Sequence, residues 1–185
     1  MSNNLKKIGI PLATIATAMM LLAPAILSTG AFAIPPTTTT TDRGLKFVGQ
    51  PQLTVNKVTN AAGFVTSASL TAVGEVSGAG TGGTATLSAT AEVTQGCINK
   101  GGNDPKGLQE TEETVIGEAE LDITRPGRGT FEVTTTEITA PSEGFTCPSA
   151  NMTPVLVSVD FTDIVLTITT DEGKTITATF PDQDP

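Results

Sequence analysis

The stretch Thr84-Ala-Thr-Leu-Ser-Ala-Thr-Ala-Glu-Val93 decides the fold class of this chain. Small or apolar residues occupy every odd-numbered position from Ala85 to Val93, and polar residues occupy the even-numbered positions. Strict alternation of this kind is typical of a β-strand with one buried and one solvated face. Cys97 falls on the apolar side of the same alternation, so the strand is expected to carry a thiol to the buried face.

Similar alternation recurs along the rest of the chain, and turn-forming residues separate the segments. No window after residue 42 has the apolar spacing of a helix. The predicted fold is therefore all-β: an antiparallel β-sandwich, immunoglobulin-like or with a similar Greek key, of about seven to nine strands. The Gly-rich segment 77–83 is expected to join strands 65–76 and 84–93 as a hairpin. The other segments with this pattern are 45–47, 53–55, 111–123, 130–138, 155–168 and 176–180.

Residues 1–33 have the features of a secretory signal peptide. Lys6 and Lys7 form a basic start, a mainly apolar stretch runs from Ile8 to Leu27, and Ala31-Phe32-Ala33 fits an A-x-A cleavage site. An uncleaved membrane anchor is the alternative, because the apolar stretch is about as long as a bilayer-spanning helix. In both cases the rest of the chain is predicted to be exported, either secreted or held at the cell surface.

Residues 34–44 follow the predicted cleavage site and are rich in proline and threonine. Such a composition does not build a core, so this segment is predicted to be an extended spacer. The folded part is then expected to be a single domain over residues 45–185, a length that suits one domain.

The charge of the chain restricts its partners. The formal net charge at pH 7 is −9, and the leader contains two of the ten basic residues, so the exported part is more acidic still. A surface of this kind repels phosphate backbones and anionic headgroups. The predicted partner is an unknown protein or a glycan. Nucleic acid is not a predicted partner. Contact with a membrane is predicted only if the leader is retained as an anchor.

The chain has two cysteines, Cys97 and Cys147. In an oxidising compartment they are predicted to form one intramolecular disulfide. Closing that loop stabilises the fold by about 4 kcal/mol in the chain-entropy model. Two free buried thiols and an intermolecular bond are the alternatives. Metal binding by the pair is not expected, because no histidine or further cysteine is present to complete a zinc site.

Catalytic signals are weak, and the chain is predicted not to be an enzyme. The sequence contains no histidine, which removes the Ser-His-Asp and Cys-His schemes. A pair of carboxylates can still hydrolyse a glycosidic bond. However, tryptophan and tyrosine, which commonly support sugar rings, are both absent. The densest acidic cluster comprises Glu110, Glu112, Glu113, Glu118, Glu120 and Asp122.

Two further site hypotheses concern calcium and glycosylation. Asp160 and Asp163 are calcium candidates, since hard cations are bound by several loop oxygens, but no Asp-x-Asp-x-Asp-Gly loop is present. No resident metal or cofactor is therefore predicted. Asn151-Met-Thr153 matches an N-glycosylation sequon, although Pro154 follows it.

One segment resembles a known group of proteins. The element Cys97-Ile-Asn-Lys-Gly-Gly-Asn-Asp-Pro105, preceded by the alternating Ala/Thr strand, is similar to a loop in small exported microbial β-domain proteins of unassigned role. The resemblance covers mainly residues 84–107, with weaker similarity around Phe145-Thr-Cys-Pro148. It implies an extracellular β-domain with a disulfide and implies no activity.

The leading functional hypothesis is an exported, non-enzymatic β-sandwich that acts as a surface or extracellular binding or structural component. One alternative is a glycoside hydrolase, which requires two carboxyl groups facing each other across a cleft. Another is a self-assembling filament subunit, which requires an exposed edge strand that pairs with a neighbouring copy.

Overall fold

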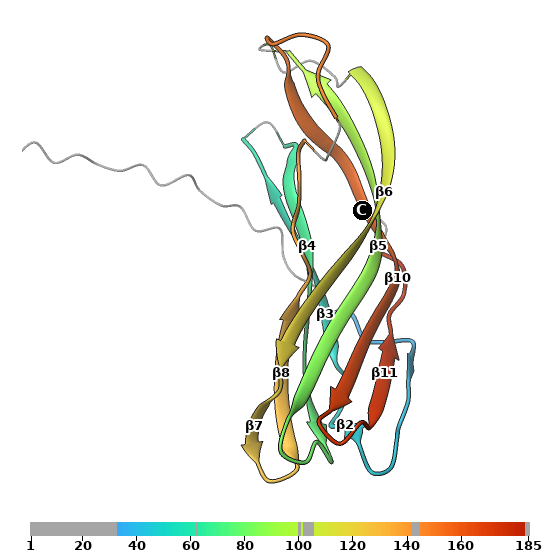
Figure 1. Ribbon diagram of the computed structural model, residues 1–185. Helices are drawn as coiled ribbons and strands as arrows, with labels where there is room; N and C mark the ends of the chain where they lie inside the picture. Colours follow the sequence, from blue (N-terminus) through green and yellow to red (C-terminus); the bar gives the residue numbers. More distant parts are fainter. Residues whose placement is uncertain (1–32, 62, 100, 102–105, 142–144, 184–185) are drawn as a thin grey trace, which may run out of the picture.

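The computed structural model describes residues 33–61, 63–99, 101, 106–141 and 145–183 (Figure 1). The predicted signal peptide therefore lies outside the described residues, apart from Ala33, as does most of the loop after Ile98. In the part described, regular structure consists of strands alone, and no helix there is long and apolar enough to cross a membrane.

Eleven strands are present, and every ladder between them is antiparallel. Three strands have only two residues each, which leaves eight longer strands, within the predicted number. The prediction of an antiparallel all-β fold is confirmed. The strands are β1 (Thr38–Thr39), β2 (Lys46–Phe47), β3 (Gln52–Thr59), β4 (Val65–Ser77), β5 (Gly83–Ile98), β6 (Lys106–Glu120), β7 (Asp122–Arg125), β8 (Arg128–Thr134), β9 (Ile138–Thr139), β10 (Thr153–Thr170) and β11 (Thr175–Thr179).

The strands fall into two groups. One group follows the order β6-β5-β10-β11-β1. In the other, β4 pairs with β2 and β3 along one edge and with β8 and β9 along the other, and β7 lies beyond β8. A single antiparallel bridge, Leu156 to Val65, joins β10 to β4. Two groups of strands around one core are consistent with the predicted sandwich.

The molecule is elongated, and β5 and β10 run through much of its length (Figure 1). Their ladder extends from Thr153–Ile98 to Thr170–Gly83, with two irregularities in β10. The strand around Thr84–Val93 is central in its group, because β5 pairs with β10 on one side and β6 on the other.

The predicted hairpin between strands 65–76 and 84–93 is wrong. β4 and β5 belong to different groups of strands, and β5 pairs with β10 and β6 instead. The connection between them contains Gly78, Gly80 and Gly83, all with positive φ. Alternation gave the correct buried face for most strands but carried no information about which strands are neighbours, so the pairing of these two consecutive strands was wrong.

The segment predicted to be an extended spacer forms hydrogen bonds with the folded strands. Ile34 exchanges two backbone hydrogen bonds with Leu53 of β3, and the amides of Thr37 and Thr40 donate to carbonyls of β11. Residues 34–40 thus contact edges of both groups of strands. The boundary expected at residue 45 is corrected to include this segment, because unpaired strand edges accept an extended chain of almost any composition.

Alanine on β5 does not leave the core empty, because the neighbouring strand supplies the bulk. Ala91 lies beside Phe161, and Ala85 lies beside Ile168, in the ladder between β5 and β10. All four side chains are fully buried. Small and large side chains on adjacent strands therefore fill one face together, as close packing requires.

Candidate functional site

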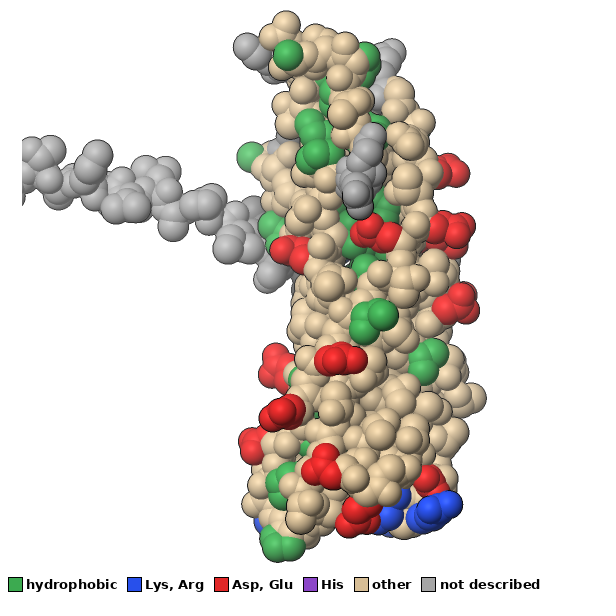
Figure 2. Space-filling view, in the orientation of Figure 1, with side chains coloured by type: hydrophobic (Ala, Val, Ile, Leu, Met, Phe, Trp, Pro, Cys, Tyr) green, Lys and Arg blue, Asp and Glu red, His purple; other side chains and the backbone are tan. Residues whose placement is uncertain are grey.

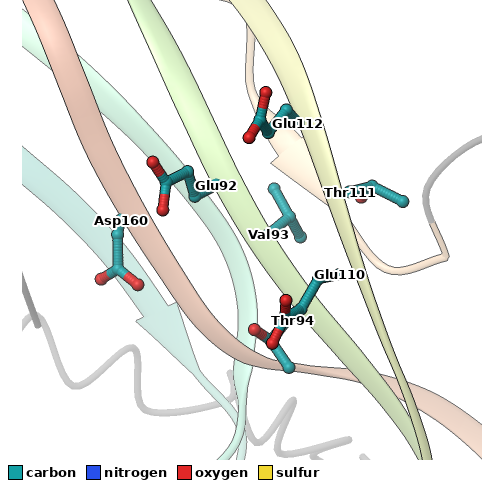
Figure 3. A pocket seen from close by; sticks show the side chains of 7 residues that line it. All are labelled: Glu92, Val93, Thr94, Glu110, Thr111, Glu112 and Asp160. Atoms are coloured by element: carbon teal, nitrogen blue, oxygen red, sulfur yellow. The ribbon is translucent and has the colours of Figure 1, made fainter.

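A hollow lies among β10, β5 and β6. Its volume is about 580 Å³. Apolar side chains of these strands point into the core, so the alternate, polar residues line the outer face. The lining residues are Glu92, Val93, Thr94, Glu110, Thr111, Glu112 and Asp160 (Figure 3).

Strand register places three carboxylates of this hollow in one row. Asp160 of β10 lies directly opposite Glu92 of β5, and Glu92 lies directly opposite Glu112 of β6. Glu110 is in the next row, opposite Thr94. Like charges directly opposite each other on one sheet face repel. We call Asp160, Glu92 and Glu112 the carboxylate row.

No described lysine or arginine forms an ion pair with the carboxylate row. The ion pairs of the described residues join Arg43 to Asp42, Arg128 to Glu75, and Lys174 to Glu172. In Figure 2 the visible basic side chains gather at one end of the molecule, whereas carboxylates are spread along it. Among the described residues, no ion pair therefore neutralises the carboxylate row.

One cation nevertheless influences Asp160. Lys57 of β3 is half-buried, and this burial lowers the pKa of its ammonium below the ordinary value of 10.5, while the negative charge of Asp160 acts in the opposite direction. Within the described structure, Oδ1 of Asp160 is buried and has no hydrogen-bond partner. In Figure 3 the Asp160 side chain lies on the far side of β10 from Glu92.

The acidic cluster noted in the sequence is divided between two places. Glu110 and Glu112 line the hollow described above. Glu120 and Asp122 line a second, smaller hollow of about 370 Å³, which also includes Glu132 of β8. In the sequence these carboxylates form one cluster, whereas in the structure each hollow combines some of them with carboxylates from other strands.

Sequence reasoning missed the carboxylate row as a unit. Glu92 and Asp160 both stand on the polar side of their alternation, which is the only local signal of their orientation. Their alignment with Glu112 depends on the register of three strands that are far apart in the sequence. No feature of the sequence indicated that Lys57 lies close enough to Asp160 to interact with it.

The two calcium candidates lie in different surroundings. Asp163 is exposed in an irregularity of β10, has a φ of 51°, and its amide donates to Oδ1 of Asp182 at 3.3 Å. Asp160 instead borders the hollow. The described residues contain no group of three or more acidic, cysteine or histidine side chains placed to hold a metal ion.

The predicted disulfide is confirmed and no free cysteine accompanies it in the described structure. Cys97 and Cys147 are joined, with their Cα atoms 5.8 Å apart. Cys97 lies near the end of β5, opposite Pro154 of β10, so the bond ties the segment before β10 to β5. Asn151 is exposed in this segment, and glycosylation there stays a prediction.

Comparisons with known proteins give no relative from which a role could be transferred. No protein-family model matches the chain, and neither a curated protein nor a solved structure shows significant similarity to it.

Proposed function

We propose that this chain is an exported, non-enzymatic component of the cell surface or extracellular space, with a structural or binding role. The observation that carries the proposal is the location of its polar groups. The interior between the two groups of strands is filled by apolar side chains, and the carboxylates lie on outer faces. A disulfide suits a protein that works in an oxidising compartment.

A carboxylate-pair hydrolase is less well supported. Glycoside hydrolysis needs one carboxyl group on each side of the scissile bond. Asp160, Glu92 and Glu112 instead stand side by side along a ladder, on the same face of neighbouring strands. No aromatic residue lines this hollow to support a sugar ring.

Self-assembly through β6 is also disfavoured. Among the described residues, this strand forms a ladder with β5 alone, so its second edge is open over the upper part of its length (Figure 1). Two copies joined at this edge would bring Glu110, Glu112 and Glu113 of one strand against the same residues of the other. Opposed like charges destabilise such pairing.

The experiment that tests the proposal combines fractionation of producing cells with an activity measurement. We expect to recover the chain from the medium or the cell envelope. Its intact mass should correspond to a chain whose first residue is Ile34. The same purified protein should release no reducing ends from envelope glycans or from a panel of soluble polysaccharides.

Two results would overturn the proposal. One is recovery of the protein from the cytosol. The other is release of sugar that disappears in both Glu92→Gln and Glu112→Gln while remaining in a Glu132→Gln control, whose carboxylate lies near the other hollow.

A further inference from the structure

The upper half of β6 is an open strand edge with unusual properties. From Lys106 to Glu113 its only ladder partner in the described structure is β5. Farther along, the carbonyl of Ile116 accepts a hydrogen bond from Thr136, so the edge is occupied there. In Figure 1 this part of β6 forms the border of the molecule, with no strand beyond it. Open edges of this kind accept an added strand.

Side chains along the open edge define which strand would fit. Glu110, Glu112 and Glu113 are exposed, and none of them has an ion-pair partner among the described residues. Leu108 is 61% exposed, the highest value for a large apolar side chain in the described structure. The edge therefore offers a partner strand several negative charges and one exposed apolar side chain, that of Leu108.

The register of the carboxylate row adds to this argument. Asp160, Glu92 and Glu112 occupy adjacent strands, and β6 is the last strand of the row. A strand added beside β6 would place its own side chain next to Glu112, as the following member of the row. A cation at that position would relieve repulsion that the described structure leaves uncompensated.

We propose that the open edge of β6, residues 107–113, binds an extended basic segment of a partner protein by β-strand addition. Main-chain hydrogen bonds to the edge supply affinity, and lysine or arginine at alternate positions of the partner pairs with Glu110 and Glu112. The proposal specifies the binding role of the proposed function and rests on it. A second copy of this chain is excluded as the occupant by the repulsion between like edges.

The test is a titration of the disulfide-bonded chain, residues 34–185, with short fluorescent peptides. The basic probe has lysine at alternate positions (Lys-Val-Lys-Thr-Lys-Val-Lys), and a matched probe has glutamate in place of lysine. A third probe keeps the lysines but carries proline at the central threonine, which removes one backbone donor and disfavours a strand. Anisotropy at low and high salt reports binding.

We expect the basic probe to bind, and to bind more weakly in high salt because exposed charges are screened. The proline and glutamate probes should bind about tenfold more weakly or not at all, since one lacks the ladder and the other adds repulsion. Hydrogen exchange should show new protection at amides of residues 107–113 in the presence of the basic probe.

Two charge-reversal variants distinguish binding at the β6 edge from nonspecific attraction of the basic peptide to an acidic protein. The double variant Glu110→Lys/Glu112→Lys should lose binding, whereas Glu132→Lys/Glu137→Lys, with the same change of charge elsewhere, should retain it. Unfolding curves of both variants verify that each is folded. Equal binding of the proline probe, equal loss in both variants, absence of binding, or dimerisation through β6 would each overturn the proposal.

These outcomes are distinguishable from failure of the proposed function. Localisation and glycan hydrolysis are measured without any peptide, so a failed titration leaves the exported, non-enzymatic role standing. Conversely, a cytosolic location or a glycan-cleaving activity overturns that role whatever the titration shows.

Discussion

At the scale of single residues, Gly117 of β6 packs directly against main chain of the other group of strands. A Cβ atom at this position would collide with the main chain of Thr134, the last residue of β8, and of Thr135, which follows it. The amide of Thr136 also donates to the carbonyl of Ile116 at 3.0 Å, so the backbone there is tied down. Only a residue without a side chain allows this contact.

We therefore expect Gly117→Ala to lower the free energy of unfolding by about 1–3 kcal/mol, as overpacking usually does. Gly129→Ala is the control, because a Cβ there meets the end of the flexible Ile123 side chain at 3.1 Å rather than backbone. Urea unfolding of both variants provides the comparison. Equal losses would mean that the contact at Gly117 has no special role.

Lys57 leads to a prediction about pH. Burial lowers the pKa of its ammonium in the folded state relative to 10.5. Between the lowered pKa and 10.5 the unfolded chain binds more protons than the folded chain, so this residue makes stability rise with pH over that window. Below the lowered folded pKa its destabilising effect is complete and constant.

The variant Lys57→Met should remove this pH dependence. We expect its stability relative to the unmodified chain to be highest near neutral pH and to decline as the pH approaches 10.5. Chemical unfolding at several pH values measures the difference, with the exposed Lys46 changed to methionine as the control. Parallel stability curves for Lys57→Met and the unmodified chain would contradict the assignment.

At the scale of elements, the segment 34–40 has a larger role than its composition suggests. It forms four backbone hydrogen bonds with edges of both groups of strands, through Ile34, Thr37 and Thr40. Ile34 also packs against the core. The segment therefore covers one edge of β11, the last strand of its hairpin.

A chain that begins at Thr41 should be less stable than one that begins at Ile34 by about 4 kcal/mol, at roughly 1 kcal/mol for each hydrogen bond. It should also associate more readily, because the edge of β11 becomes open. Urea unfolding and sedimentation test the two expectations. Unchanged stability would show that the segment only rests on the surface.

At the scale of the whole molecule, the disulfide closes a long loop of the chain. Cys97 and Cys147 are separated by 50 residues in sequence, and this loop includes β6, β7, β8 and β9. Replacing both cysteines by serine should lower stability by about 4 kcal/mol in the chain-entropy model. Non-reducing unfolding measures the loss, and reduction of the unmodified chain should reproduce it.

The distribution of charged residues is also a property of the whole molecule, whose formal net charge is −9 for the full chain. Basic residues pair with acidic ones near the turns at one end, while the long outer face of β10, β5 and β6 retains uncompensated carboxylates. An extended acidic face favours basic partners and speeds their encounter with the molecule.

The sequence by itself determined the fold class, the buried face of most strands and the pairing of the two cysteines. Alternation is a local property with a period of two, so Leu87, Leu166 and Ile176 were assigned to the core without knowledge of any neighbour. Because the chain has only two cysteines, a single intramolecular pairing was available.

Only the tertiary structure decided which strands are neighbours. It separated β4 from β5, brought residues 34–40 into the fold, aligned Asp160 with Glu92 and Glu112, and left the edge of β6 open. The physical reason is that every outer strand face carries the same polar pattern. Ladder partners and register depend on the packing of the whole core, which no local stretch of the chain contains.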